Sequence, residues 1–366
     1  MKKLRPLTLP MCLALLLLSN VDIHACTTFI LSHGDRLAFG RNLDWHTGIG
    51  LIIVNKRNVS KVALISPPEK PAEWVSKYGS ITFNQVGREL PYGGINEAGL
   101  VVEHMTLDET QYPGRDSLCA VNECQWIQYH LDNCSTVQEV IESSSSVRIA
   151  QAESNFHFLI CDRSGDAATI EFLNGDLVCH TRKSMLIGVL ANSTYAQSLK
   201  HPKERTGPIA NKSLENFVTA ADMVKKYNSD SGTSVIDYSF GILKAVSQGP
   251  FTKWSIVYDI ENMKIYYRTY VSPGIKIVDI EDFDFSCSVP SEVVDLNIDE
   301  GGLINKDFVP CSTGIDKDVI FRTFNFFRNM GFLTQISDSD LTSLAEYPES
   351  FECVESPKDR EQKITH

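Results

Sequence analysis

Alternation of apolar and polar positions predicts a strand-rich chain that begins with a β-hairpin. Cys26–Leu31 is a short β-branched and apolar run, His33-Gly34-Asp35 is a turn signal, and Leu37–Trp45 returns as a second strand. The same criteria predict further strands at Leu51–Val54, Val62–Ile65, Ser80–Val86, Phe156–Cys161, Ala168–Phe172, Leu177–His180, Trp254–Asp259 and Lys264–Tyr270. We therefore expect sheets joined by short turns to form the core.

Helical periodicity appears in two pairs of segments and once more near the C-terminus. The predicted helices are Asn122–Cys134, Ser135–Ser143, Ser213–Tyr227, Ser234–Val246 and Asp316–Phe332. Ser135 is the expected N-cap of the second helix, with Glu139 in its first turns. The order of strands, two helices, strands, two helices and strands predicts a layered α+β sandwich rather than alternating βαβ units.

The composition is that of a globular protein with an acidic balance. Of 366 residues, 43% are hydrophobic and 22% are charged, so the apolar material suffices for a sizeable core. The formal net charge of -12 argues against nucleic acid or an anionic membrane surface as the main partner. Functions that depend on such partners are therefore disfavoured.

The first 25 residues have the three-part pattern of a secretory signal peptide. Basic residues come first, Leu7–Leu18 is apolar over about half the length that spans a bilayer, and the small residue Ala25 precedes the expected cut. Cleavage there would leave a mature chain that starts at Cys26. We expect this chain to be periplasmic or secreted and to have no stable membrane insertion; a buried N-terminal helix is the alternative.

Export would place the cysteines in an oxidising compartment. Apart from Cys26 and one cysteine of the predicted signal peptide, eight remain, which allows up to four disulfides of undetermined connectivity. Cys161 and Cys179 could face each other across a hairpin, whereas a regular helix would hold Cys124 and Cys134 too far apart. No CxxC pair exists, so the sequence predicts no metal site.

Cys26 is chemically informative if it is the first residue of the mature chain. Its α-amine, with a reference pKa of roughly 7.7–8.0, can accept the proton of its thiol, with a reference pKa of roughly 8.5. Nucleophile and general base then reside in one residue. The alternative is a lipid-anchored periplasmic binding or structural protein with Cys26 acylated, although Ile23-His24-Ala25 is a poor lipobox because His24 is bulky and polar.

The second arm of the predicted hairpin carries charges that would face this N-terminus. Arg41 and Asp44 lie within the segment Gly40–Trp45, opposite Cys26. Regular strand geometry sends these two side chains to opposite faces, so we expect a bend or bulge that lets both reach the cysteine. Arg41 would favour the thiolate and Asp44 would orient the α-amine. A surface ion pair of little energetic value is the alternative.

Six short segments stand in an order that is more specific than any one of them. They are Cys26-Thr27-Thr28-Phe29, Gly40–Trp45, Trp74–Ser80, Gly94–Leu100, Val189–Ser193 and Trp254–Asp259. Together they resemble the choloylglycine hydrolase family of N-terminal-nucleophile hydrolases, which includes bile salt hydrolases and penicillin V acylases. The likeness runs from Cys26 to about Phe285. We therefore expect an amidohydrolase domain at 26–285 and an extension packed on it at 286–366, with disordered last residues.

The resemblance implies a four-layer αββα sandwich of antiparallel sheets and a role for each matching residue. Cys26 would be the nucleophile and, through its amine, the general base, with Arg41 and Asp44 as positioning partners. The side chain of Asn192 and the backbone N–H of Thr106 would hold the oxyanion. The resemblance implies no metal and no cofactor.

Substrate binding is less well determined than the chemistry. An acyl group needs flat apolar walls, which Trp45 and Trp74 could supply, although core packing is an equal alternative. Asn216 stands where the family has an arginine, and Thr106 stands where it has Asn or Tyr. Ser193-Thr194 replaces a proline that usually follows the oxyanion Asn.

These observations predict an exported amidohydrolase that cleaves linear amide C–N bonds of small N-acyl compounds. The candidates are substrates of the penicillin V, acyl homoserine lactone or conjugated bile salt type. The departure at Asn216 keeps an inactive hydrolase-like protein as a further alternative. The oligomeric state, including a homo-oligomer, is left open by the sequence.

Overall fold

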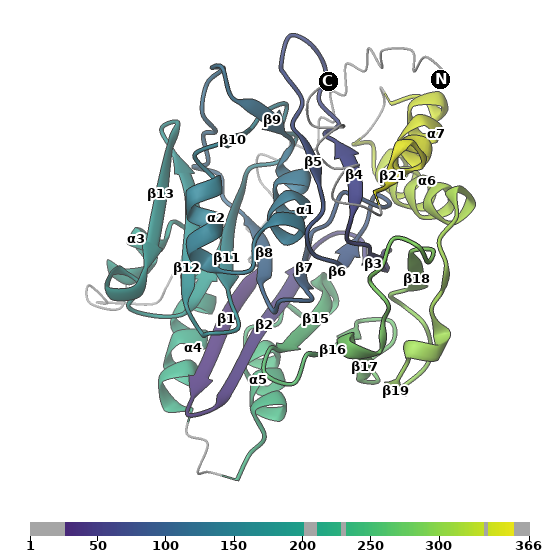
Figure 1. The fold of residues 1–366 in the computed structure, drawn as a ribbon. Helices are drawn as coiled ribbons and strands as arrows, with labels where there is room; N and C mark the ends of the chain where they lie inside the picture. The colour runs from purple at the N-terminus through teal and green to yellow at the C-terminus, as the bar shows by residue number, and fades with distance from the viewer. Residues whose placement is uncertain (1–25, 201–210, 228–231, 333–335, 355–366) are drawn as a thin grey trace.

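The structure is a computed structural model that describes residues 26–200, 211–227, 232–332 and 336–354. Two large sheets lie face to face with helices on both outer sides (Figure 1). The predicted αββα sandwich is confirmed. The predicted signal peptide at 1–25 and the expected disorder at the C-terminal end, 355–366, lie outside the described residues.

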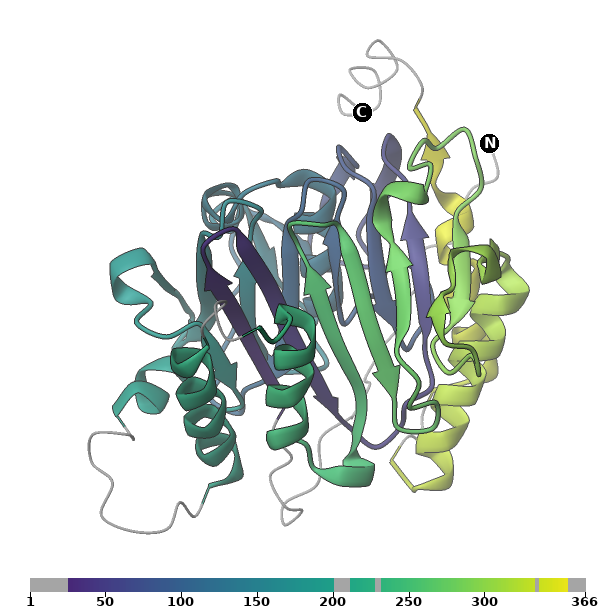
Figure 2. The same cartoon turned by 90° about the horizontal axis from the view of Figure 1, so that it is seen from below.

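The first sheet has seven strands and contains the N-terminal hairpin. Its strand order is β14 (Val189–Ala191), β1 (Thr27–His33), β2 (Arg36–Asp44), β15 (Thr252–Asp259), β16 (Lys264–Thr269), β17 (Lys276–Asp279) and β19 (Gly302–Leu303). Neighbouring strands are antiparallel except β17 and β19, which are parallel. Figure 2 shows the purple β1–β2 hairpin beside the green strands of this sheet, with the blue strands of the other sheet behind.

The second sheet has nine strands and is antiparallel throughout. Its order is β13 (Asp176–Thr181), β12 (Ala167–Leu173), β11 (Phe156–Cys161), β8 (Val101–Thr106), β7 (Gly93–Asn96), β6 (Ser80–Asn84), β3 (Leu51–Asn55), β18 (Glu292–Asp295) and β20 (Val309–Pro310). Two small sheets complete the fold: β9 (Cys119–Val121) with β10 (Val147–Ile149), and β4 (Val59–Val62) between β5 (Glu73–Val75) and β21 (Glu352–Cys353).

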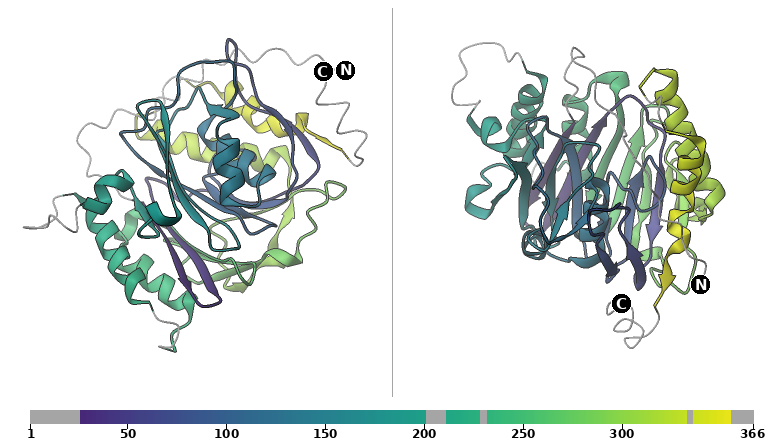
Figure 3. Two further views of the ribbon diagram at one scale, coloured as in Figure 1. Left: turned by 60° about the vertical axis from the view of Figure 1, so that its left-hand side comes forward. Right: turned by 90° about the horizontal axis from the view of Figure 1, so that it is seen from above.

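Helices cover the outer face of each sheet (Figure 3). On the seven-stranded sheet, α4 (Lys212–Lys226) contacts β1 and β14, and α5 (Val235–Ala245) contacts β2 and β15. On the nine-stranded sheet, α1 (Glu123–Asn133) contacts β7 and β8. The remaining helices are α2 (Val137–Ser143), α3 (Tyr195–Lys200), α6 (Thr313–Asn329) and α7 (Asp338–Glu346). The arrangement buries one apolar cluster between the sheets and under α4 and α5, and a second cluster under α1, α6 and α7.

Some predicted boundaries differ from the structure. The N-cap of α2 is Thr136 rather than Ser135, because Thr136 accepts the N–H of Glu139 while Ser135 donates to the Glu139 carboxylate. The strand expected at Val62–Ile65 lies earlier, at β4. The chain leaves that sheet after Val62, where the N–H of Leu64 donates to the side chain of Gln125.

The segment after residue 285 is more than an extension packed on a domain. Its strand β18 pairs with β3 inside the nine-stranded sheet, and β19 pairs with β17 in the seven-stranded sheet. Within 286–312, short strands alternate with turns. The two sheets therefore depend on residues from both sides of the expected boundary.

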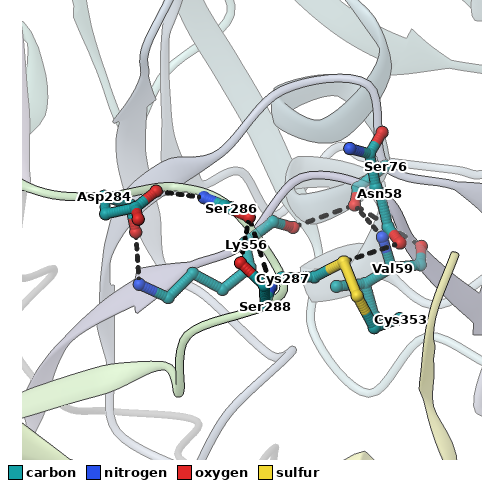
Figure 4. The surroundings of a disulfide bond; sticks show 9 residues. All are labelled: Lys56, Asn58, Val59, Ser76, Asp284, Ser286, Cys287, Ser288 and Cys353. Atoms are coloured by element: carbon teal, nitrogen blue, oxygen red, sulfur yellow. Dashed lines mark hydrogen bonds between the residues drawn. A yellow bond between two sulfur atoms is a disulfide. The ribbon is translucent and has the colours of Figure 1, made fainter. Parts of the chain in front are cut away.

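Among the described cysteines one disulfide is formed, Cys287–Cys353, within the limit of four that the sequence allowed (Figure 4). It ties β21 to the segment that precedes β18, next to the carbonyl of Asn58, which accepts the N–H of Val354. The expected pairing across a hairpin is wrong, because β12 lies between the strands that carry Cys161 and Cys179. Both remain free thiols.

Candidate active site

Cys26 lies directly before β1, at the end of the sandwich where strands of both sheets begin or end. Thr27 pairs with Ala191 of β14 on one side and with Asn42 of β2 on the other. One step back in this register places Cys26 beside Asn192. The thiol is nearly buried, with 6% exposure, and is flanked by the backbone of Asp44: the Asp44 nitrogen lies 3.5 Å and its carbonyl oxygen 3.7 Å from Sγ.

The carboxylate of Asp44 is held on the side of the sheet that α5 covers. Gln248 Nε2 donates to one carboxylate oxygen over 3.0 Å, and Thr252 Oγ1 donates to the other. The expected irregularity exists, but it lies in β15, where the register against β2 shifts between Thr252 and Trp254. The sequence-based expectation that the Asp44 side chain reaches the thiol needs correction, since its contact with Cys26 is through the backbone.

Arg41 points the opposite way, into the space between the sheets. Its Nη1 lies 2.8 Å from Oε2 of Glu103 on β8, and neither side chain is exposed. The hydroxyl of Tyr258 donates to the other Glu103 oxygen over 2.5 Å. The alternative of a surface Arg41–Asp44 pair is therefore wrong: Arg41 and Asp44 occupy opposite faces of β2, and Arg41 pairs with a buried carboxylate of the other sheet.

Asn192 and Thr106 meet across the two sheets. Asn192 Nδ2 donates to the Thr106 carbonyl oxygen over 2.7 Å and contacts its Oγ1 at 2.5 Å. Leu107 donates its N–H to the backbone carbonyl of Asn155, directly before β11, so the alternation of an antiparallel ladder turns the N–H of Thr106 away from that strand. Two N–H groups suited to a developing oxyanion are thus brought to the same end of the sandwich as Cys26.

Burial dominates the protonation behaviour of this site. Burial and the nearby Asp44 carboxylate raise the pKa of the Cys26 thiol to about 12, although Arg41 and the Asp44 backbone N–H oppose the rise. Burial also raises the pKa of Asp44 to about 6, against the hydrogen bonds from Thr252 and Gln248. A thiol in this setting needs a base in immediate contact to become a nucleophile.

Trp45 follows Asp44 and lies at the border of both apolar clusters. Its ring centroid is 6.1 Å from Phe327 and 5.3 Å from His46. His46 itself packs against the rings of Phe251 and Phe327. The structure therefore places a group of aromatic side chains next to the end of β2.

Trp74 and Asn216, the other two predicted substrate-binding residues, are both buried. Trp74 on β5 donates its Nε1 hydrogen over 2.8 Å to Asp132, which also binds the buried Lys61 at 2.9 Å. Asn216 on α4 is buried, and its amide donates over 3.2 Å to the carbonyl of Val246 at the end of α5. These contacts hold Trp74 within the packed interior, and they hold Asn216 within the helix layer that covers β1 and β14.

Within the described ranges, no group of three or more His, Cys, Asp or Glu side chains is arranged to hold a metal ion. In the same residues, no helix combines the length and hydrophobicity needed to cross a membrane.

Four residues of this site escaped sequence reasoning: Glu103, Gln248, Thr252 and Tyr258. Glu103 stands alone among apolar residues in Val101–Thr106, and a lone charge in an apolar strand was the available signal. Tyr258 lies in the segment Trp254–Asp259 that carries part of the resemblance, but sequence reasoning assigned no role to its side chain. Gln248 and Thr252 lie more than 200 residues after Cys26, and nothing local in the sequence relates them to it.

Known proteins resemble this chain in sequence. The sequence profile of the family described as linear amide C-N hydrolases, choloylglycine hydrolase family, matches residues 26–236. A penicillin V acylase of Pectobacterium atrosepticum is 25% identical over 341 residues, which cover 78% of this chain and 89% of that protein.

Two solved structures share the fold. A penicillin V acylase from Agrobacterium tumefaciens has a TM-score of 0.69 at 24% identity and covers 78% of this chain and 98% of its own. A variant of the conjugated bile acid hydrolase from Clostridium perfringens has a TM-score of 0.61 at 18% identity and covers 76% of this chain and 99% of its own.

Proposed function

The chain belongs to the choloylglycine hydrolase family and is a linear amide C–N hydrolase, and from this premise we propose that Cys26 is its N-terminal nucleophile. One observation carries the proposal. The strand register sets Cys26 beside Asn192, while the backbone of Asp44 contacts its sulfur on the other side. The thiol thus lies between a hydrogen-bond donor for an oxyanion and the backbone of Asp44.

The reaction needs the α-amine of Cys26, which becomes free when residues 1–25 are removed. The amine takes the thiol proton, and the thiolate sulfur forms a bond to the amide carbonyl carbon. The Asn192 side chain and the Thr106 N–H stabilise the resulting oxyanion. The intermediate collapses when the C–N bond breaks and the α-ammonium returns its proton to the leaving nitrogen. Water then hydrolyses the thioester, again with the amine as base.

Arg41 and Asp44 are positioning partners in this scheme. Thr252 and Gln248 fix the Asp44 carboxylate next to the point where β1 begins, where it can hydrogen-bond an α-amine. The Arg41 guanidinium lies on the inner face, where its charge favours the thiolate.

The substrate we propose is a small N-acyl compound with an apolar acyl group. The relatives are named penicillin V acylases and a conjugated bile acid hydrolase. Trp45 and its aromatic neighbours offer a flat apolar wall beside Asp44. Phenoxyacyl penicillins, acyl homoserine lactones and conjugated bile salts all fit this description. A hydrolysis panel across these classes identifies the substrate.

Export is the second part of the proposal. The signal-like pattern at 1–25 supports a periplasmic or secreted protein, and its cleavage would expose Cys26. The mass of the protein purified from its natural host tests both. A free chain that begins at Cys26 supports the enzyme, whereas a lipid adduct on Cys26 supports an anchored protein.

The decisive experiment compares two chains that differ only at the N-terminus. A chain that starts at Cys26 should be active, and one that retains a single residue before Cys26 should lose about 10²–10⁴-fold in kcat, because its α-nitrogen is an amide without a basic lone pair. Cys26→Ala should be inactive in both forms. Equal activity of the two chains would overturn the proposal. A histidine such as His46 would then be the candidate base, as in a Cys–His dyad.

A further inference from the structure

A buried ion pair links the two sheets directly behind Cys26. Arg41 Nη1 and Glu103 Oε2 are 2.8 Å apart, and both side chains are completely buried. None of the three guanidinium nitrogens of Arg41 makes a hydrogen bond among the described residues, so the charge of Glu103 is what holds this guanidinium there. A buried charge of this kind requires a fixed partner.

The site is shaped to hold the Glu103 carboxylate. Tyr258 OH donates to Oε1 over 2.5 Å, which leaves Oε2 to face Arg41. Gly93 on the adjacent strand β7 makes room for the carboxylate: a Cβ atom there would lie 2.0 Å from Oε2 and 2.2 Å from Cδ of Glu103. The fold therefore keeps this carboxylate in a single position.

The pair is placed to act on the thiol. Arg41 pairs with Thr28, which lies on the same strand face as Cys26, two residues after it. Glu103 lies three residues before Thr106 on β8, so one strand carries both the anion that holds Arg41 and the proposed oxyanion donor.

We propose that Glu103 is a positioning residue for the nucleophile: it fixes the Arg41 guanidinium between the sheets and offsets its charge at Cys26. This inference rests on the proposed role of Cys26. Its consequence is that Arg41 activates the thiol only weakly, so activation depends on the α-amine.

The charged groups around the Cys26 sulfur predict in which direction the pKa of the thiol should change when Glu103 is altered. Asp44 and Glu103 raise the pKa of the Cys26 thiol, and Arg41 lowers it. Arg41 also lowers the pKa of His104, which lies on the opposite face of β8 from Glu103. Removing the Glu103 charge alone should therefore lower the pKa of the thiol.

The test measures alkylation of Cys26 by iodoacetamide against pH, followed by peptide mass mapping so that the other thiols do not interfere. In a chain that starts at Cys26, Glu103→Gln keeps an acceptor for Tyr258 but removes the charge. Burial raises the pKa of Glu103 to about 7, so the profiles are compared above that pH, where Glu103 is ionised in the parent. Each unit by which the pKa of the thiol falls raises the alkylation rate about threefold, since the tenfold gain in thiolate is partly offset by its lower nucleophilicity. Glu103→Asp should behave more like the parent.

Two further variants serve as a second test and as a control. Gly93→Ala displaces the carboxylate without changing any charged residue, and it should shift the profile in the same direction if Glu103→Gln does not fold. Glu123→Gln removes another buried carboxylate, which accepts the N–H groups of Glu153 and Ser154 and does not contact Arg41. It should leave the profile unchanged.

An unchanged alkylation profile in folded Glu103→Gln or folded Gly93→Ala overturns the inference, as does an equal shift in Glu123→Gln. Because alkylation reads the thiol and not turnover, this result is independent of the N-terminal extension experiment. If the extended chain is as active as the chain that starts at Cys26, the α-amine has no part in the mechanism. The alkylation profiles still decide whether Glu103 acts on Cys26 through Arg41.

Discussion

Asn192 reaches across from the end of β14 and donates its side-chain amide to Thr106 at the end of β8, at 2.7 Å from the carbonyl oxygen and 2.5 Å from the hydroxyl oxygen. The bond to the carbonyl orients the amide, and the bond to the hydroxyl occupies the second N–H. In the proposed reaction the hydroxyl gives way to the oxyanion. The contact therefore links a residue of one sheet to the oxyanion site of the other.

Asn192→Ala should lower kcat by about 10²–10³-fold, because one oxyanion donor is lost. The thermal midpoint should change little, since the side chain is only partly buried. Asn133→Ala is the matched control: it removes a partly buried amide on α1 that donates to the Tyr129 carbonyl, so it should leave kcat unchanged. Steady-state kinetics and thermal melts separate the two. Unchanged turnover in Asn192→Ala would remove this residue from the mechanism.

Thr106→Val tests the hydroxyl separately from the backbone N–H. The variant keeps the shape of the side chain and loses the oxygen that accepts from Asn192. A lost hydrogen bond of about 1 kcal/mol predicts a reduction of kcat of less than about tenfold. Thr106→Ser should restore the parent rate. A fall as large as that of Asn192→Ala would show that the hydroxyl itself contacts the transition state.

Asp44 gives a pH prediction with a definite sign. Burial raises its pKa to about 6, above the usual value for Asp. A raised pKa means that the folded state favours the protonated form, so the stability contribution is complete below about pH 4 and is lost as the pH rises through about 6. Asp44→Asn should therefore be more stable than the parent at pH 8, and this difference should shrink toward pH 4.

Activity should follow the opposite course, because the ionised carboxylate orients the amine. We expect kcat/KM of the parent to fall as the pH drops through about 6, and this limb should be absent from the residual activity of Asp44→Asn. Asp222→Asn, an exposed substitution on α4, serves as the control. Melting curves and pH–rate profiles that do not differ between Asp44→Asn and this control would contradict the assignment.

Local periodicity was enough to predict the N-terminal hairpin and the four longer helices that frame the sandwich. It failed for β8, where Glu103 and His104 interrupt the apolar run, and for β14, which is only three residues long. Both strands are held by partners far away in sequence, so a local pattern carries little information about them. The two strands that supply Thr106 and precede Asn192 were thus among those that periodicity alone missed.

The site also divides into features that short motifs reveal and features that depend on distant parts of the chain. Cys26, Arg41, Asp44 and Asn192 could be named from short motifs. The orientation of Arg41 could not, because its partner Glu103 comes from the other sheet. For Trp74 the sequence left acyl pocket and core packing equally open for a similar reason: it reveals a flat apolar side chain, but only the fold shows that its N–H is bound to a buried carboxylate.

The disulfide can be tested without assaying activity. Alkylation of the mature, unfolded but unreduced protein should label seven cysteines and leave Cys287 and Cys353 unlabelled. The bond closes a loop with a sequence separation of 66, for which loop entropy predicts a contribution of up to about 4 kcal/mol. Cys353→Ser should accordingly lower the unfolding midpoint in denaturant. Labelling of all nine cysteines would show that the bond does not form.

Trp74 and Trp45 provide a paired test of core against substrate pocket. Trp74→Phe removes the N–H that binds Asp132 beside Lys61, and a buried acceptor left with one partner fewer should cost about 1–3 kcal/mol of stability. Its kcat/KM should equal that of the parent. Trp45 has no hydrogen-bond partner for its Nε1 among the described residues, so Trp45→Phe should cost little stability.

If Trp45 lines the acyl site, Trp45→Phe should raise KM for aryl and long acyl substrates. KM for short acyl substrates should remain nearly unchanged. The physical reason is that the smaller ring buries less of the acyl group, and each lost 40 Å² or so of contact is worth about 1 kcal/mol. Denaturant unfolding and a KM series over acyl length measure both effects. A KM change in Trp74→Phe without loss of stability would reverse the assignment and return Trp74 to the substrate site.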